Sequence, residues 1–291
     1  MRTVAVLLPV LLVLAIILIV AAVRPQPQIP VESGSRLSSV RRRTSGWHWG
    51  GVVLGAVLAF GAVQAGGTLG RGAMLAGPLF ALGVLVGVNV GELRVAAPSV
   101  GARSAPLEVR RVRDYVPKRL TAAVAVTACT LGLLLAATTA FGSPDDLGRA
   151  GRWLVRACSD NMTVSSGPWP GSFYSVPLAG IVLGGLAATA FALQQLVRRP
   201  RQGEQVVVDD MLRYNAASAV IAAGGILVAV PLAGTSAIAG IALFGSACPL
   251  WWTTALGWSL VACAACATVL AVWCTAVLAL PTRTATRHEV G

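Results

Sequence analysis

The sequence predicts an all-α fold, a polytopic membrane bundle of seven transmembrane helices. The 291 residues are 56% hydrophobic and only 12% charged, a composition too apolar for a soluble domain with one buried core. Apolar runs of about 20 residues, the length that crosses the hydrocarbon core of a bilayer, recur along the chain. Each run is expected to be a helix, because a helix satisfies its own backbone hydrogen bonds in lipid. The seven runs are Val4–Val23, Gly50–Gly66, Ala73–Val90, Leu120–Phe141, Val176–Val197, Ala216–Phe244 and Thr253–Leu280.

The basic residues between these runs predict the orientation of the bundle. Eighteen of the 23 Lys and Arg residues follow the first, third and fifth runs or lie in the C-terminal tail. Short connections rich in Lys and Arg stay in the cytoplasm, so we expect the N-terminus outside and the C-terminus in the cytoplasm. The net charge of +12 is explained by this asymmetry, and without a basic soluble domain we expect no nucleic-acid partner.

The chain divides into a first transmembrane helix, a linker and a six-span bundle. We assign them to residues 1–24, 25–46 and 47–291, with an external loop at 142–175 inside the bundle. The linker is polar and holds three prolines, which predicts a flexible cytoplasmic segment. The first run could instead be a cleaved signal peptide, since Arg2 precedes it and Ala21-Ala22 ends it. Cleavage would leave the basic run 41–43 outside, against the charge pattern.

Glycines spaced four residues apart predict close helix packing. Gly83, Gly87 and Gly91 share one face of the third span, and the same spacing occurs at Gly51/Gly55 and Gly180/Gly184. Small residues on one face let two helix backbones approach each other in lipid.

The external loop begins with a sequence typical of a helix N-terminus. Ser143 is a favoured cap, Pro144 suits the first position, and Asp145 and Asp146 suit the first turn. The following residues have apolar and basic faces at helical spacing up to position 157. We therefore expect an amphipathic helix on the outer surface of the membrane.

Cysteine positions predict one disulfide. Cys158 and Cys248 are the two of the six cysteines that lie in connections, and both connections are predicted to be external. An oxidising compartment would let them pair, although two unrelated loop thiols are also compatible with the sequence. Cys263 and Cys266 share a helix face and suggest thiol redox chemistry, but their depth in an apolar span also fits simple packing.

Pro231 is the expected hinge of the protein. It lies in the middle of the sixth run, which is 29 residues long and therefore exceeds the thickness of a bilayer core. Proline lacks an N–H and clashes with the carbonyl four residues before it, which predicts a kink near Leu227–Ala229.

Several segments outside the helix centres resemble a family of uncharacterised multi-pass membrane proteins from actinobacteria. The segments are VGELRVAAP, LEVRRVRDYVPKRL, DDLGRAGR, GPWPGSFYSVPLA and VDDMLRYNAASAV, which cover spans three to seven. The resemblance implies a bacterial plasma membrane protein. It implies no activity, because no function is established for that family.

The function that the sequence favours is a non-enzymatic structural, accessory or sensory membrane component. A transporter or permease subunit is the alternative, although the polar residues in the spans are neutral and near span ends, as at Gln64 and Asn89. A membrane thiol/quinone oxidoreductase is the second alternative. We assign no catalytic, cofactor-binding or metal-ligating residue and expect no cofactor. The expected partners are the lipid bilayer and other membrane proteins, and the sequence leaves the oligomeric state open.

Overall fold

The fold is described by a computed structural model that covers residues 36–66, 69–95, 112, 115–159, 162–198, 206–245 and 250–279. The first predicted span, Val4–Val23, lies outside these described residues. Each of the other six predicted runs coincides, except for at most one terminal residue, with part of a helix long and apolar enough to cross a membrane. The helices are α2 (Arg36–Ala65), α3 (Arg71–Val95), α4 (Lys118–Ala140), α5 (Ser172–Arg198), α6 (Val206–Phe244) and α7 (Trp251–Ala279).

Helix α2 begins earlier than the sequence suggested. It starts at Arg36, so the later part of the segment 25–46, predicted to be a flexible linker, is helical. No proline follows Pro30 in that segment, so no residue there interrupts the hydrogen bonds of a helix. The prediction of a flexible linker is therefore wrong from Arg36 onwards.

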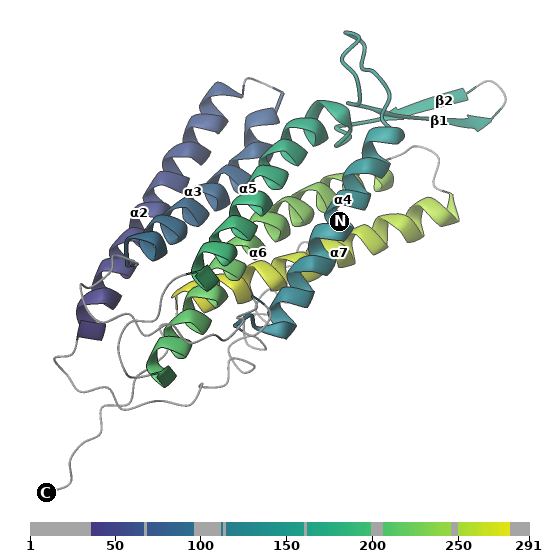
Figure 1. Cartoon of the computed structure of the whole chain (residues 1–291). Coiled ribbons are helices and arrows are strands. Elements are labelled where there is room, and N and C mark those ends of the chain that lie inside the picture. The colour runs from purple at the N-terminus through teal and green to yellow at the C-terminus, as the bar shows by residue number, and fades with distance from the viewer. Residues whose placement is uncertain are drawn as a thin grey trace, which may run out of the picture.

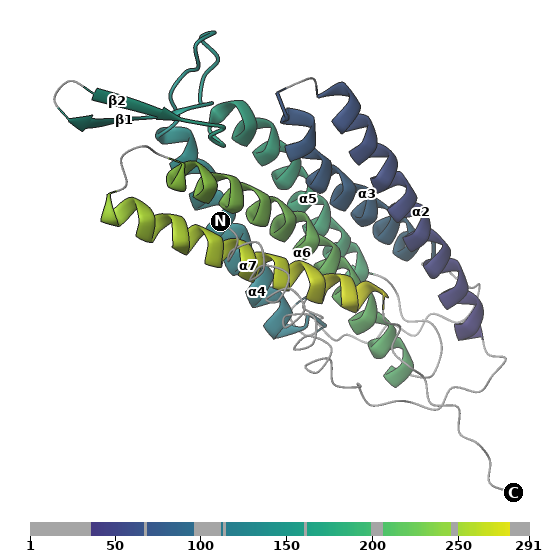
Figure 2. The same ribbon diagram turned by 180° about the vertical axis from the view of Figure 1, so that it is seen from behind.

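The six helices form one bundle with α6 near its centre. In Figures 1 and 2, α2 and α3 lie at one side, α4 and α7 lie at the other, and α6 runs between them. Helix α6 contacts α3, α4, α5 and α7, whereas α2 packs chiefly against α3. In the apolar part of α6, 78% of the residues are buried, whereas in that of α2 only 11% are buried.

Helices α2 and α3 meet through glycines. A Cβ atom added at Gly51 would lie 2.8 Å from the Cα of Gly87, and one added at Gly83 would collide with the backbone of Gly55. The two helix backbones are therefore in direct contact, as the spacing of Gly83 and Gly87 predicted. Gly91 is buried one turn further along α3. By contrast, Gly180 and Gly184 of α5 face open space.

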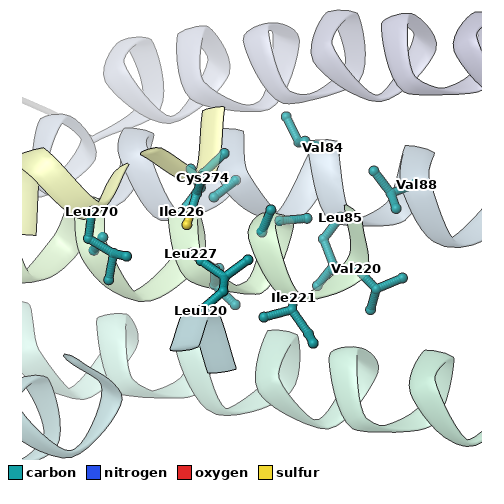
Figure 3. Packing of buried hydrophobic residues seen from close by; sticks show 14 residues of the cluster. Val84, Leu85, Val88, Leu120, Val220, Ile221, Ile226, Leu227, Leu270 and Cys274 are labelled. Carbon is teal, nitrogen blue, oxygen red and sulfur yellow. The ribbon is translucent and has the colours of Figure 1, made fainter. Parts of the chain in front are cut away.

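The central core is built from side chains rather than from backbone contacts. Residues of α3, α4, α6 and α7 interdigitate around Leu227, which is completely buried (Figure 3). Figure 3 shows Leu85 of α3 beside Val220 and Ile221 of α6. Such interdigitation gains many small dispersion contacts, which are the main source of helix association in lipid.

Helix α6 continues without interruption through Pro231. The Thr235 hydroxyl donates a hydrogen bond to the Pro231 carbonyl at 2.7 Å and is buried. A break of the helix at Pro231 is thus excluded. A bend near Leu227–Ala229 stays a prediction.

The connection between α4 and α5 is a β-hairpin, so the prediction of an amphipathic outer helix from Ser143 is wrong. Strand β1 (Leu154–Ser159) pairs antiparallel with β2 (Met162–Ser166), and the hairpin projects from one end of the bundle (Figures 1 and 2). Gly148 and Gly151 have φ angles of +74° and +73°, which a right-handed helix cannot contain. The acids and the cap residue of the expected helix instead form a closed turn.

Candidate functional site

Organised polar contacts gather at the two ends of the bundle. We call one end the hairpin end: it holds the segment 142–171 and the first turns of α3 and α5. The other, the opposite end, holds the last turns of α3 and α5 and the first turns of α4 and α6. The last turn of α2 also lies at the hairpin end (Figure 1). These two ends are the candidate functional surfaces.

Asp145 organises the loop at the hairpin end. One carboxylate oxygen, Oδ1, accepts hydrogen bonds from the backbone N–H groups of Leu147 (3.1 Å) and Arg149 (2.9 Å). The other, Oδ2, accepts hydrogen bonds from the side chains of Arg149 (2.7 Å) and Arg152 (2.6 Å). Each oxygen thus accepts two hydrogen bonds. The carboxylate thereby stabilises the turn that the positive φ angles of Gly148 and Gly151 allow.

The same contacts keep Asp145 ionised. Burial by itself raises the pKa of the Asp145 carboxyl group. The hydrogen bonds from Arg149, Arg152 and the Leu147 backbone outweigh burial and lower this pKa from 3.8 to about 2. The carboxylate therefore stays charged at any pH near neutrality.

Aromatic residues fasten this loop to the helix ends. The Trp169 indole donates a hydrogen bond to the Thr138 carbonyl at the end of α4 (2.8 Å). The Tyr174 hydroxyl donates one to the Leu69 carbonyl in the α2–α3 connection (2.8 Å). The α4–α5 connection is thereby fastened to the end of α4, and the start of α5 to the residue before α3.

Phe173 lies beside two arginines at this surface. The guanidinium carbon of Arg71 is 5.0 Å from the centre of the Phe173 ring, and that of Arg152 is 5.6 Å from it. These are cation–π distances. Arg71, at the start of α3, thereby meets the loop and the first turn of α5.

The hairpin also covers the ends of α6 and α7. Leu154 is buried against Ala239 and Ala242 of α6. The Arg156 guanidinium lies 6.0 Å from the Trp252 ring of α7. A cavity of about 320 Å³ lies between β2 and the last turns of α6 and is lined largely by apolar groups.

The opposite end brings together segments that are far apart in the sequence. The Tyr115 hydroxyl donates a hydrogen bond to Asp210 at 3.2 Å, across 95 residues. The Arg213 side chain, 2% exposed, donates one to the Leu196 carbonyl at the end of α5 (3.1 Å). Arg94 of α3 lies 4.2 Å from the Trp47 ring of α2. The residues just before α4 and the first turns of α6 thus meet here.

Hydroxyl groups inside the bundle are bonded to nearby backbone carbonyls. Thr138 donates to the Leu135 carbonyl, and Thr235 to that of Pro231, so the proton of each hydroxyl is already used within its own helix. Ser236 of α6 is hydrogen-bonded to the Cys263 sulfur of α7 at 3.6 Å. Within the described residues, no group of three or more His, Cys, Asp or Glu side chains could hold a metal ion.

The predicted disulfide stays a prediction. Cys158 lies in β1, and Cys248 lies outside the described residues. The free thiols of the described chain are Cys129, Cys263, Cys266 and Cys274, and Cys158 is not among them. Cys266 is exposed on the surface of α7.

Sequence reasoning missed the network of Asp145, Arg149 and Arg152. The signal was present, because Gly148 and Gly151 interrupt the segment at the spacing of tight turns. The contacts of Phe173 with Arg71 and of Tyr115 with Asp210 had no local signal.

Comparison of the chain with models of protein families, with curated proteins and with solved structures finds no match. The candidate sites are therefore interpreted from their own geometry.

Proposed function

We propose that the protein is a non-enzymatic structural, accessory or sensory component of a bacterial plasma membrane. One observation carries this proposal: the middle of the bundle is occupied by α6, whose buried side chains pack against four neighbouring helices. A packed helix in that place leaves the two ends as the surfaces available to other molecules. Both ends carry the ordered polar contacts described above.

The transporter alternative requires a polar path along the bundle. The positions facing the neighbours of α6 include Ala222, Ala223 and Ala229, all fully buried, and the apolar Leu227 and Val228. Buried hydroxyls nearby are bonded to helix carbonyls. These contacts favour a packed scaffold over a substrate path.

Labelling of single cysteines tests this proposal. A cysteine placed at Ala229, in the core of α6, should resist a water-soluble maleimide in intact membranes. A cysteine placed at Ala150, in the exposed loop, should react fully. Mass spectrometry of the labelled peptides separates both from the native thiols. Reaction of Ala229→Cys at a rate within roughly tenfold of Ala150→Cys would indicate an aqueous path and favour transport.

The oxidoreductase alternative rests on Cys263 and Cys266. The Cys263 thiol is hydrogen-bonded to Ser236, and the Cys266 thiol is exposed on α7. Neither thiol lines the cavity between β2 and α6. A redox role predicts a disulfide between these two cysteines after treatment with an oxidised quinone. Packing predicts that both stay reduced.

We infer an orientation with the hairpin end outside and the opposite end in the cytoplasm. The distribution of Lys and Arg along the sequence supports it. We further propose that Val4–Val23 forms a seventh span before the six helices, because it is an uncharged apolar run of membrane-spanning length. Phosphatase fused after Gly245 should be active, and phosphatase fused after Arg113 should be inactive. Strong activity after Arg113 would reverse the assignment.

We also propose that Cys158 pairs with Cys248, which would join the hairpin to the α6–α7 connection. The oxidising environment outside the plasma membrane supports this pairing. Non-reducing mass spectrometry of the native protein should find a peptide pair linked through these residues. Alkylation of both thiols without prior reduction would exclude the bridge.

A further inference from the structure

A basic cavity at the hairpin end lies beside the network of Asp145. It has a volume of about 360 Å³ and lies between the start of α3, the loop after α4 and the first turns of α5. Two arginines from distant segments, Arg71 and Arg149, line it together with the hydroxyl-bearing Ser172. Guanidinium groups and a hydroxyl are donors that suit a phosphate group.

The charges around this cavity leave an excess of positive charge. The Asp145 carboxylate is already bonded by Arg149, Arg152 and two backbone N–H groups. Among the described residues that line the cavity, none is acidic. The positive charges nearby belong to Arg71, Arg149 and Arg152. They outnumber the carboxylates of Asp145 and the exposed Asp146 by three to two. The Arg149 side chain uses its Nε for Asp145, and its terminal amino groups can still donate.

The arginines are held near the cavity by their contacts. Arg149 is fixed by its hydrogen bonds to Asp145, and Arg71 by the Phe173 ring at 5.0 Å. Guanidinium groups that are held in place lose less entropy when an anion binds. These contacts therefore favour the binding of an anion in this open hollow.

The remaining wall of the cavity is apolar and lies on the exposed surface of α5. Phe173, Val176 and Pro177 of α5 form it, and Val176 is 64% exposed. Val176 lies one turn after the start of α5, where a membrane-spanning helix enters the headgroup region. The cavity therefore joins cationic donors to an apolar surface at the boundary between headgroups and acyl chains.

We propose that this cavity binds the phosphate group of an anionic ligand, with Arg71 and Arg149 as the charged donors and Ser172 as a further donor. A phospholipid headgroup fits best, because its acyl chains would continue along Val176 and the exposed surface of α5. Free phosphate shares the same recognition chemistry and is separated from the lipid by the experiment.

Binding is measured on the full chain in detergent, with short-chain phosphatidylglycerol, short-chain phosphatidylcholine and inorganic phosphate as separate probes. The variant is Arg71→Gln. Its matched control is Arg198→Gln, which removes another exposed positive charge, at the far end of the bundle. Phosphatidylglycerol should bind the native chain, and Arg71→Gln should weaken this binding roughly tenfold, as expected for loss of one charge-assisted contact. Arg198→Gln should leave it unchanged.

Each outcome decides the proposal. Arg71-dependent binding of phosphatidylglycerol alone identifies a lipid headgroup, and Arg71-dependent binding of inorganic phosphate identifies a free anion. Equal losses in both variants, or equal affinity for the zwitterionic phosphatidylcholine, would overturn a site that selects anionic ligands. Should Arg71→Gln fail to fold, Arg71→Lys can be used instead. Lysine keeps a positive charge near Phe173 but lacks the planar guanidinium group that donates two parallel hydrogen bonds. It should then weaken phosphatidylglycerol binding several-fold, and native affinity in this variant would contradict the proposal.

Discussion

Helices α2 and α6 are both long enough and apolar enough to cross a membrane, yet they occupy opposite environments. Of the residues in the apolar part of α6, 78% are buried within the protein, whereas only 11% of those in the apolar part of α2 are buried. Helix α6 is held by side chains of four other helices, and α2 chiefly by α3. Apolar character therefore identifies a membrane helix without indicating whether it faces lipid or protein.

The reason is that lipid tails are as apolar as leucine. Burial against another helix gains little hydrophobic free energy in a bilayer, so packing quality decides which surfaces meet. Helix α2 gains close packing through the backbone at Gly51 and Gly55, and α6 gains it through interdigitated side chains. This contrast between backbone packing and side-chain packing can be tested directly.

The largest effect is expected at the glycine contact. Gly83→Val places a side chain against the backbone of Gly55, which cannot move aside without separating α2 from α3. We expect a loss of about 3 kcal/mol or more in the free energy of unfolding, measured by SDS titration. The control Gly184→Val enters open space on α5 and should change stability by less than about 0.5 kcal/mol. Equal effects would mean that backbone contact does not hold α2.

A second pair extends the test of backbone contact to the loop. Gly151 and Gly148 both have positive φ angles, but a Cβ on Gly151 would also collide with Ser172 and Gly171. Gly148→Ala should cost about 1 to 2 kcal/mol from its backbone conformation alone. Gly151→Ala should cost about 3 kcal/mol, because steric overlap adds to this. Thermal unfolding of both variants would measure the difference, and a smaller loss for Gly151→Ala would contradict the packing.

A third pair compares side-chain packing in the two helices. Val228 of α6 is completely buried, and Val57 of α2 is 62% exposed. Val228→Ala should lower the free energy of unfolding by about 1 to 2 kcal/mol through the cavity that it leaves. Val57→Ala should lower it by less than about 0.5 kcal/mol, since lipid fills the space. A comparable loss at Val57 would indicate that another surface covers α2.

The smallest effect is expected from acid. The pKa of Asp145 is lowered from 3.8 to about 2, so its carboxylate stabilises the folded loop above pH 3.8. This contribution should disappear as the pH falls from 3.8 towards 2. The melting temperature of the native chain should therefore decline over that interval more steeply than that of Asp145→Asn. Parallel curves would show that the network adds nothing to stability.

Local sequence determined the helices and one of their contacts. The length and apolar character of each run are sufficient for a helix, because a chain in lipid must satisfy its own backbone hydrogen bonds. The four-residue spacing of Gly83 and Gly87 likewise predicted a close helix contact, since it leaves a continuous groove on one face. The identical spacing of Gly180 and Gly184 leads to no contact in this chain, so spacing alone does not select a partner.

The loop after α4 was open to two interpretations. Ser143 and Asp145 are favourable at a helix start, and Gly148 and Gly151 are favourable in turns. The carboxylate of Asp145 decided between them by bonding two arginines, which holds the turn closed. A local cap preference was overridden by charge pairing and by the conformational freedom of glycine.

The sequence by itself determined that this protein has membrane-length helices and which apolar runs they contain. Only the tertiary structure decided that α6 lies at the centre, that Tyr115 meets Asp210, and that Arg71 meets Phe173. The physical reason is that helix formation depends on neighbours within a few residues. The assignment of partners depends on the fit between surfaces that are far apart along the chain.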